Sequence, residues 1–166
     1  MEYLCHATTH QEGQAAKWLL TRWGGWGVPD GCYELIQDSH SAWGERLPEC
    51  AQGRLAAVIF NLGYLPGGDK TVMTRAETTL PAVRLGLDYL RPGGLLLLVS
   101  YYIRVTAGGA VEALTLREFA CGLPPGKWQV TEYQSHAQGC GNNFMAALAA
   151  SGSVFRQFSS TVPSAS

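Results

Sequence analysis

The stretch LAAVIFN, residues 55–61, is apolar and continuous up to its final asparagine. A second run of this kind, LLLLVSY at residues 95–101, follows the PGG sequence of residues 92–94. Unbroken apolar runs of this length are typical of strands covered on both faces, as in the parallel sheets of α/β proteins. A third segment, YELIQ at residues 33–37, is shorter and is also predicted to be a strand. These runs predict an α/β fold.

The segment between the first two runs has the pattern of an amphipathic helix. Its apolar residues recur at steps of four and three, which places them along one face: Ala76, Leu80, Val83, Leu87 and Leu90. Thr74 and Glu77 have the spacing of a capping box, so the helix is predicted to begin there or, alternatively, at Pro81. The RPGG sequence of residues 91–94 ends it. Strand, helix and strand form a βαβ unit, whose crossover is predicted to be right-handed.

Weaker patterns predict further elements: helices at residues 14–23 and 110–121, and strands antiparallel to each other at residues 128–133 and 144–149. In the second of these helices, Val111, Leu114 and Phe119 are expected to face the core. Residues 159–166 are polar and low in complexity, and are predicted to be a disordered tail. The preceding residues, 1–158, are expected to form a single domain, because a chain of 166 residues has room for one core.

The amino-acid composition argues against several classes of binding partner. The formal net charge is -1 with 12 Lys and Arg, so no basic face for a long nucleic-acid backbone is expected, and an RNA contact would be local. The five cysteines contain no C-x-x-C pair, so neither a metal site nor a disulfide framework is predicted. No apolar run is long enough to span a bilayer and the N-terminus lacks a signal-peptide pattern, so no membrane partner and a cytoplasmic location are expected.

The segment NLGYLPGGDK, residues 61–70, leaves the carboxyl end of a predicted strand, where open α/β sheets bind their ligands. Its glycines allow the backbone to approach a ligand closely, Asn61 offers a donor and an acceptor, and Tyr64 offers a flat face. The segment nearly matches a phosphate-binding loop, but Asp69 stands between the last glycine and Lys70, which argues against phosphate. A glycine-rich surface turn is the plain alternative.

The full string of residues 61–70, followed by TRAETT at residues 74–79, resembles the YtqB-like family, once called putative rRNA methylases. Members of that family are similar to the enzymes that methylate the aminomethyl group of 5-aminomethyl-2-thiouridine at the wobble position of tRNA. The resemblance covers about residues 27–133. It implies a partial Rossmann-like class I methyltransferase fold, with a mostly parallel sheet and a C-terminal antiparallel hairpin. It also implies S-adenosylmethionine as cofactor and a tRNA anticodon stem-loop as partner.

The resemblance also implies roles for individual residues. Asn61, Tyr64 and Asp69 would be catalytic. Residues beside the cofactor would be Asp38, Ser39, His40, Asn61 and Gly63, with Asp38 accepting from the adenine amino group. Substrate-binding residues would be Leu65, Pro66, Gly67, Gly68, Lys70 and Tyr101. Without the family context, Asp38-Ser39-His40 would equally suit a helix cap.

The first part of the chain departs from the family. Residues 1–9 contain no glycine, and residues 1–26 lack the glycine-containing cofactor loop that follows the family's first strand. Strands one and two of the family are therefore expected to be missing, which would leave the strand at residues 55–61 with an open edge. Residues 1–9 as a substitute strand, or the strand at residues 33–37, would fill this edge; otherwise the edge predicts pairing with another chain, for instance in a homodimer. The alternative function is that of a truncated, non-catalytic relative acting as a binding or interaction module.

Overall fold

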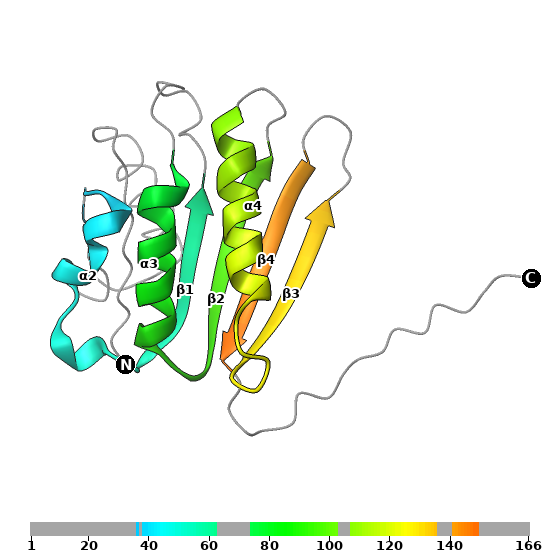
Figure 1. Ribbon diagram of the computed structural model, residues 1–166. Coiled ribbons are helices and arrows are strands. Elements are labelled where there is room, and N and C mark those ends of the chain that lie inside the picture. Colours follow the sequence, from blue (N-terminus) through cyan, green and yellow to red (C-terminus); the bar gives the residue numbers. More distant parts are fainter. Residues whose placement is uncertain (1–35, 37, 63–73, 103–106, 136–140, 150–166) are drawn as a thin grey trace, which may run out of the picture.

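The computed structural model describes residues 36, 38–62, 74–102, 107–135 and 141–149. In chain order their elements are the 3-10 helix η1 (His40–Ala42), α2 (Trp43–Arg46), the 3-10 helix η2 (Glu49–Ala51), β1 (Leu55–Leu62), α3 (Ala76–Tyr89), β2 (Leu90–Tyr102), α4 (Ala107–Cys121), β3 (Trp128–Ser135) and β4 (Gly141–Ala149) (Figure 1). The predicted strand at residues 33–37, the predicted helix at residues 14–23 and the predicted tail lie largely or wholly outside the described residues. The single-domain boundaries stay a prediction.

The described strands form one sheet in the order β1-β2-β4-β3. β1 pairs with β2 in parallel, and β4 pairs antiparallel with both β2 and β3. Three strands therefore run in one direction, and β4 runs against them. The predicted α/β class, the two apolar strands and the antiparallel C-terminal pair are confirmed. The β1-α3-β2 crossover is right-handed, as predicted (Figure 1).

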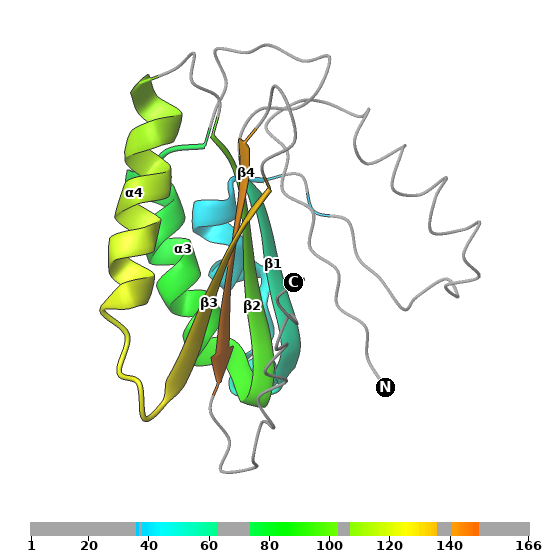
Figure 2. The same ribbon diagram turned by 90° about the vertical axis from the view of Figure 1, so that its right-hand side faces the viewer.

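Helices α3 and α4 cover one face of the sheet (Figure 2). The strand residues that face them are buried, because alternate side chains of a strand point to the same side. The buried apolar core comprises Trp43, Leu47, Phe60, Leu62, Ala82, Val83, Leu87, Leu90, Leu96, Leu98, Leu116, Ala120 and Trp128. Leu96 on β2 is fully buried at its centre, and Ile59, on the opposite face of β1, is 64% exposed. The core thus lies between the sheet and its helices.

Helix α3 begins at Ala76, which is close to the first of the two predicted starts. The predicted capping box is wrong, because the N-cap is Arg75 and has no side-chain hydrogen bond. The hydroxyl of Thr74 instead donates to Glu112 on α4. Pro81 lies inside the helix, and it is exposed together with Glu77, the residue one turn earlier. Water can therefore bond to the Glu77 carbonyl, whose intrahelical partner proline lacks.

Gly86 allows α3 to pack closely against the sheet. A Cβ atom built at Gly86 would lie 3.0 Å from Cδ1 of Leu96 and 3.4 Å from Cγ1 of Val58. Both of these contacts come from side chains of β1 and β2, so a larger residue here would push the helix outward. Gly86 therefore lets α3 lie close to these two strands.

Helix α4 ends at Cys121 as predicted but begins at Ala107, three residues before the predicted start, and the prediction of its inward face is partly wrong. Val111 and Leu114 are 57% and 52% exposed, whereas Phe119 packs against the core as predicted. The residues that point inward recur at steps of four: Glu112, Leu116 and Ala120. Val111 and Leu114 were predicted to be buried because they are apolar. The face of the helix that packs against the core instead carries the charged residue Glu112.

Strand β2 begins earlier than predicted, at Leu90. Residues 91–94 were expected to be a stop between helix and strand, but they belong to the strand, with an irregular register opposite Leu55 and Ala57. Gly93 has a φ of 74°, a conformation that L side chains rarely adopt. A Cβ atom at Gly94 would lie 2.9 Å from the carbonyl oxygen of Arg91. The two glycines therefore let the chain turn directly from helix into strand.

Within the described residues, β1 is at the edge of the sheet and has β2 as its neighbour. The expected open edge of that strand stays a prediction, because residues 1–35 and 37 lie outside the described part of the chain. Its pairing with another chain stays a prediction.

Candidate functional site

The candidate site lies at the carboxyl edge of the sheet. β1 ends at Leu62 and β2 ends at Tyr102, and α3 and α4 begin after these ends, at Ala76 and Ala107. The short helix η1 packs against α3. Because parallel strands place their carboxyl ends together, the segments that follow them form the ligand-binding edge of open α/β sheets.

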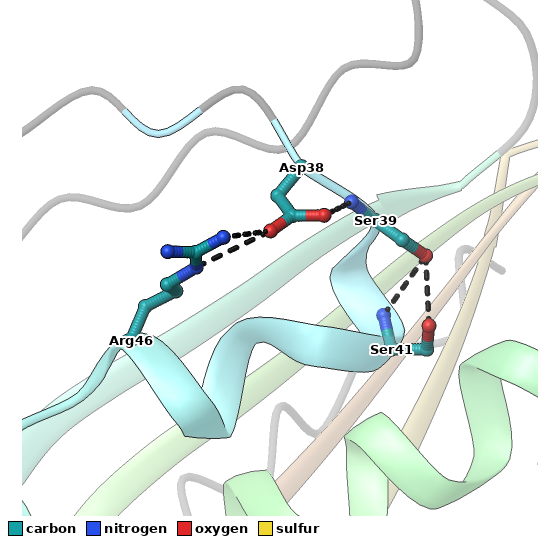
Figure 3. A network of polar contacts seen from close by, with 4 residues as sticks. All are labelled: Asp38, Ser39, Ser41 and Arg46. Atoms are coloured by element: carbon teal, nitrogen blue, oxygen red, sulfur yellow. Dashed lines mark hydrogen bonds and ion pairs between the residues drawn. The ribbon is translucent and has the colours of Figure 1, made fainter.

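Asp38 and Ser39 shape the entry to η1 (Figure 3). Oδ1 of Asp38 accepts from the Ser39 amide at 2.7 Å, and Oδ2 accepts from Arg46 at 2.7 Å from Nη2 and 3.2 Å from Nε. Ser39 is the N-cap of η1, and its hydroxyl accepts from the Ser41 amide at 3.3 Å. The cap interpretation therefore holds for Ser39. The Asp38 side chain keeps 28% of its surface exposed, so a ligand can still reach it.

His40 points the opposite way, into the protein. Its residue surface is 8% exposed, and its ring lies edge-on to Phe60 of β1, with centroids 6.4 Å apart and planes at 88°. Nε2 of His40 lies 3.1 Å from Oγ1 of Thr79 in the first turn of α3. His40 therefore anchors the segment that precedes it. The role beside adenine that the family resemblance implies for residues 38–40 stays a prediction.

Glu112 joins three segments of this edge through two hydroxyl groups. It is 3% exposed, and its Oε1 accepts from Thr79 at 2.6 Å. Its Oε2 accepts from Thr74 at 2.7 Å. Thr79 is fully buried and also contacts His40, so one carboxylate of α4 links the start of α3, Thr74 two residues before it, and η1. Both oxygens of the buried carboxylate thus receive a hydrogen bond, which lowers the cost of its burial.

Asn61 occupies the penultimate position of β1 and is exposed. Its neighbours Phe60 and Leu62 are buried toward the helices, so Asn61 faces the other side of the sheet. Its backbone pairs with Val99 of β2. Asn61 is therefore accessible at the carboxyl edge, on the face away from His40.

Several predicted site residues cannot be placed. Those that lie outside the described residues are Gly63, Tyr64, Leu65, Pro66, Gly67, Gly68, Asp69 and Lys70. Tyr101 belongs to β2, where its backbone pairs with Asn142 of β4, and its side chain is not described. The roles predicted for these residues are untested.

Sequence reasoning missed Glu112, Thr79 and Arg46. A glutamate in an apolar helix is ordinarily assigned to solvent, so Glu112 was not considered as a core residue. Its spacing of four from Leu116 was the available signal, together with two threonines near the start of α3. Asp38 precedes η1 and Arg46 ends α2, so their ion pair depends on how these two short helices turn and could not be predicted from the sequence.

Metal-ligand clusters and membrane-spanning helices are both absent from the described residues. These residues contain no group of three or more His, Cys, Asp or Glu side chains arranged to hold a metal ion. Within the same residues, each helix is too short or too polar to cross a membrane.

Comparison with protein families gives one match over most of the chain. The family model described as "Putative rRNA methylase" matches residues 25–149. A protein of Arabidopsis thaliana named "tRNA (mnm(5)s(2)U34)-methyltransferase, chloroplastic" is 42% identical over 103 residues. The aligned residues make up 62% of this chain and 36% of that protein, so this chain spans about a third of the length of the curated relative.

Solved structures resemble the fold closely. A structure from Clostridium thermocellum titled as a putative rRNA-methylase is 26% identical with a TM-score of 0.73, covering 87% of this chain and 74% of that one. A structure from Streptococcus mutans, titled as a putative methyltransferase in complex with SAH, is 28% identical with a TM-score of 0.71 and the same coverage. An O-methyltransferase structure from Klebsiella pneumoniae, at 16% identity and a TM-score of 0.63, shows the shared fold, and its coverage is 90% of this chain and 62% of that one.

Proposed function

Because this chain belongs to the family described as "Putative rRNA methylase", we propose that it acts as an S-adenosylmethionine-dependent RNA methyltransferase. The observation that carries the proposal is the family match over residues 25–149, whose described part presents the carboxyl edge of an α/β sheet. The Streptococcus mutans relative, crystallised with SAH, supports the cofactor class.

We further propose the aminomethyl group of wobble 5-aminomethyl-2-thiouridine in tRNA as the methyl acceptor. The name of the Arabidopsis relative supports a tRNA substrate of this chemistry. The net charge of -1 favours a local contact with the anticodon stem-loop over a long phosphate interface. The cytoplasm stays the predicted compartment, whereas the name of the Arabidopsis relative places that protein in the chloroplast.

The described residues fit the adenosine end of the cofactor. Asp38 offers a carboxylate with 28% of its side chain exposed, and each carboxylate oxygen has two lone pairs, so Asp38 can accept from an adenine amino group. The hydrogen bond from the Ser39 amide and the Arg46 ion pair hold this carboxylate in one orientation. When bound, S-adenosylmethionine supplies an electrophilic methyl group. No described residue is assigned to its methionine end.

Asn61 suits the orientation of the attacking amine. Its side chain is exposed at the carboxyl end of β1, and its amide carbonyl can accept from an amine hydrogen. In a displacement at a methyl group, orientation of the nucleophile supplies a large share of the rate. Tyr64 packing on the thiouracil and Asp69 assisting proton removal complete the proposed site, and both residues lie outside the described part of the chain.

Two measurements on the full chain test the proposal. Isothermal titration calorimetry with S-adenosylhomocysteine is expected to show micromolar binding. Transfer of tritiated methyl groups from S-adenosylmethionine is then measured on tRNA that carries 5-aminomethyl-2-thiouridine, with tRNA that carries unmodified uridine at the wobble position as control. Tritium found in the tRNA that carries 5-aminomethyl-2-thiouridine, and absent from the control tRNA, would support the proposed methyl acceptor.

The outcomes separate the candidate functions. Binding of S-adenosylhomocysteine with label in neither tRNA would retain the methyltransferase class and reject this acceptor. Absence of both binding and transfer would favour the non-catalytic alternative, for which the edge position of β1 in the described sheet is the supporting observation.

A further inference from the structure

One buried hydroxyl group separates His40 from Glu112. Oγ1 of Thr79 lies 2.6 Å from Oε1 of Glu112 and 3.1 Å from Nε2 of His40, and Thr79 is fully buried. A threonine hydroxyl has a single hydrogen to donate. Thr79 donates that hydrogen to the Glu112 carboxylate, so its oxygen can only accept from His40. Nε2 of His40 must therefore carry a proton.

The direction of this chain of hydrogen bonds is set by Glu112. Its second oxygen accepts from Thr74, so the carboxylate receives hydrogen bonds from both threonines. The three side chains come from η1, α3 and α4, and each is buried: His40 at 8%, Thr79 at 0% and Glu112 at 3% exposure. Burial excludes water that would compete for these hydrogen bonds. The carboxylate therefore fixes the direction of the Thr79 hydroxyl, and the hydroxyl in turn fixes the imidazole as its donor.

The arrangement exceeds what stability alone requires. An apolar trio of the same shape would fill this space at little or no net loss of stability, whereas a buried polar network is favourable only when each member is paired. The ring of His40 is also fixed by the edge-on contact with Phe60. Asp38 and Ser39 directly precede His40, so the orientation of His40 sets where these two residues lie.

We propose that Glu112, acting through Thr79, is a positioning residue that holds His40 in its Nε2-protonated form and thereby fixes residues 38–40 for the adenosine end of the cofactor. The cofactor part of this inference rests on the proposed function, because it takes residues 38–40 as the adenosine-binding segment. The hydrogen-bond relay itself rests on the contacts among His40, Thr79 and Glu112.

Two substitutions of nearly equal size separate the hydroxyl from the shape of Thr79. Thr79→Val keeps the volume and removes the hydroxyl, and Thr79→Ser keeps the hydroxyl and removes a methyl group. Thr79→Ala serves as a second hydroxyl-free variant if the valine variant fails to fold. The chain has four histidines, so a His40→Gln variant assigns the His40 signals in long-range 1H–15N spectra.

The spectra are expected to show a proton on Nε2 of His40 in the wild-type chain and in Thr79→Ser. In Thr79→Val the preference for that proton position is expected to be lost. Affinity for S-adenosylhomocysteine, measured by calorimetry, should fall about tenfold in Thr79→Val, which corresponds to about 1.4 kcal/mol. Thr79→Ser should remain within about threefold of wild type.

Each measurement can overturn a different part of the inference. An unchanged His40 proton position in both hydroxyl-free variants would refute the relay, whatever their affinity. Equal affinity in the serine and valine variants, with the proton position altered, would refute its role in positioning. If the wild-type chain binds no S-adenosylhomocysteine, the proposed function and the cofactor role both fail, and the spectra still decide whether Glu112 acts on His40.

Discussion

The hydroxyl of Thr74 donates a 2.7 Å hydrogen bond to Oε2 of Glu112, although the two residues are 38 positions apart. Thr74 stands two residues before α3, and Glu112 lies on α4. The bond therefore ties the end of the segment that follows β1 to the helix that follows β2. The sequence predicted that Thr74 would form a capping box with Glu77, three residues away. Thr74 instead bonds to a helix that is distant in sequence and lies at the same edge of the sheet.

Replacement of Glu112 by alanine should lower the free energy of unfolding by about 2–4 kcal/mol, because the buried hydroxyl of Thr79 and the partly buried hydroxyl of Thr74 lose this acceptor. Glu118→Ala on the exposed side of α4 is the matched control and should change stability by less than about 0.5 kcal/mol. Urea unfolding followed by circular dichroism measures both. Equal effects of the two variants would show that the Glu112 hydrogen bonds contribute nothing net.

Gly94→Ala should destabilise the protein by about 2 kcal/mol, since the added Cβ meets backbone and cannot be accommodated by a side-chain rotation. That atom would lie 2.9 Å from the Arg91 carbonyl oxygen and 3.1 Å from the Leu55 carbonyl oxygen. Gly126→Ala is the control, because its Cβ would have nothing within 4 Å. Thermal unfolding of the two variants side by side provides the measurement, and a wild-type midpoint for Gly94→Ala would contradict the geometry.

Asp38→Ala should separate cofactor affinity from stability. Its partner Arg46 is 54% exposed, so loss of this ion pair should cost less than about 1 kcal/mol of stability. Affinity for S-adenosylhomocysteine should nevertheless fall about tenfold or more if the carboxylate accepts from adenine. Glu132→Ala removes a second ion pair, with Arg117, and should leave the affinity unchanged. An equal affinity loss in the two variants would argue against a direct role of Asp38.

Asn61→Ala should reduce methyl transfer about a hundredfold through loss of orientation of the amine. Stability should change by less than about 0.5 kcal/mol, because the side chain is exposed. Gln129→Ala, an exposed amide on β3, is the control for the loss of a surface amide from the sheet. Turnover of Asn61→Ala equal to that of Gln129→Ala would remove Asn61 from the mechanism.

Strands β1 and β2 could be predicted from the sequence because most of their side chains are apolar. Residues 55–60 and 95–99 contain no polar residue, so a buried strand was the simplest interpretation of each. β3 and β4 were predicted from weaker patterns, and their mutual pairing followed from adjacency in the chain. The placement of β4 between β2 and β3 is a tertiary arrangement that strand patterns alone do not encode.

The candidate site was less predictable, because its polar contacts join distant segments. Thr74 and Glu77 fit a capping box locally, but the Thr74 hydroxyl bonds to Glu112 across the structure. Burial of the same glutamate also made the predicted inward face of α4 wrong. Apolar periodicity assigns Val111 to the core and Glu112 to solvent, whereas Val111 is exposed and Glu112 is buried. Propensity arguments consider neighbours along the chain, and long-range hydrogen bonds override them.

The position of β4 affects the order in which the sheet can be completed. β4 lies between β2 and β3 but follows both in the chain. During translation, the ribosome therefore releases β1, β2 and β3 before the strand that joins them. A nascent chain that stalls before residue 141 leaves one side of β2 bare, and bare strand edges promote aggregation. Correct synthesis of this protein thus depends on prompt emergence of its last described strand.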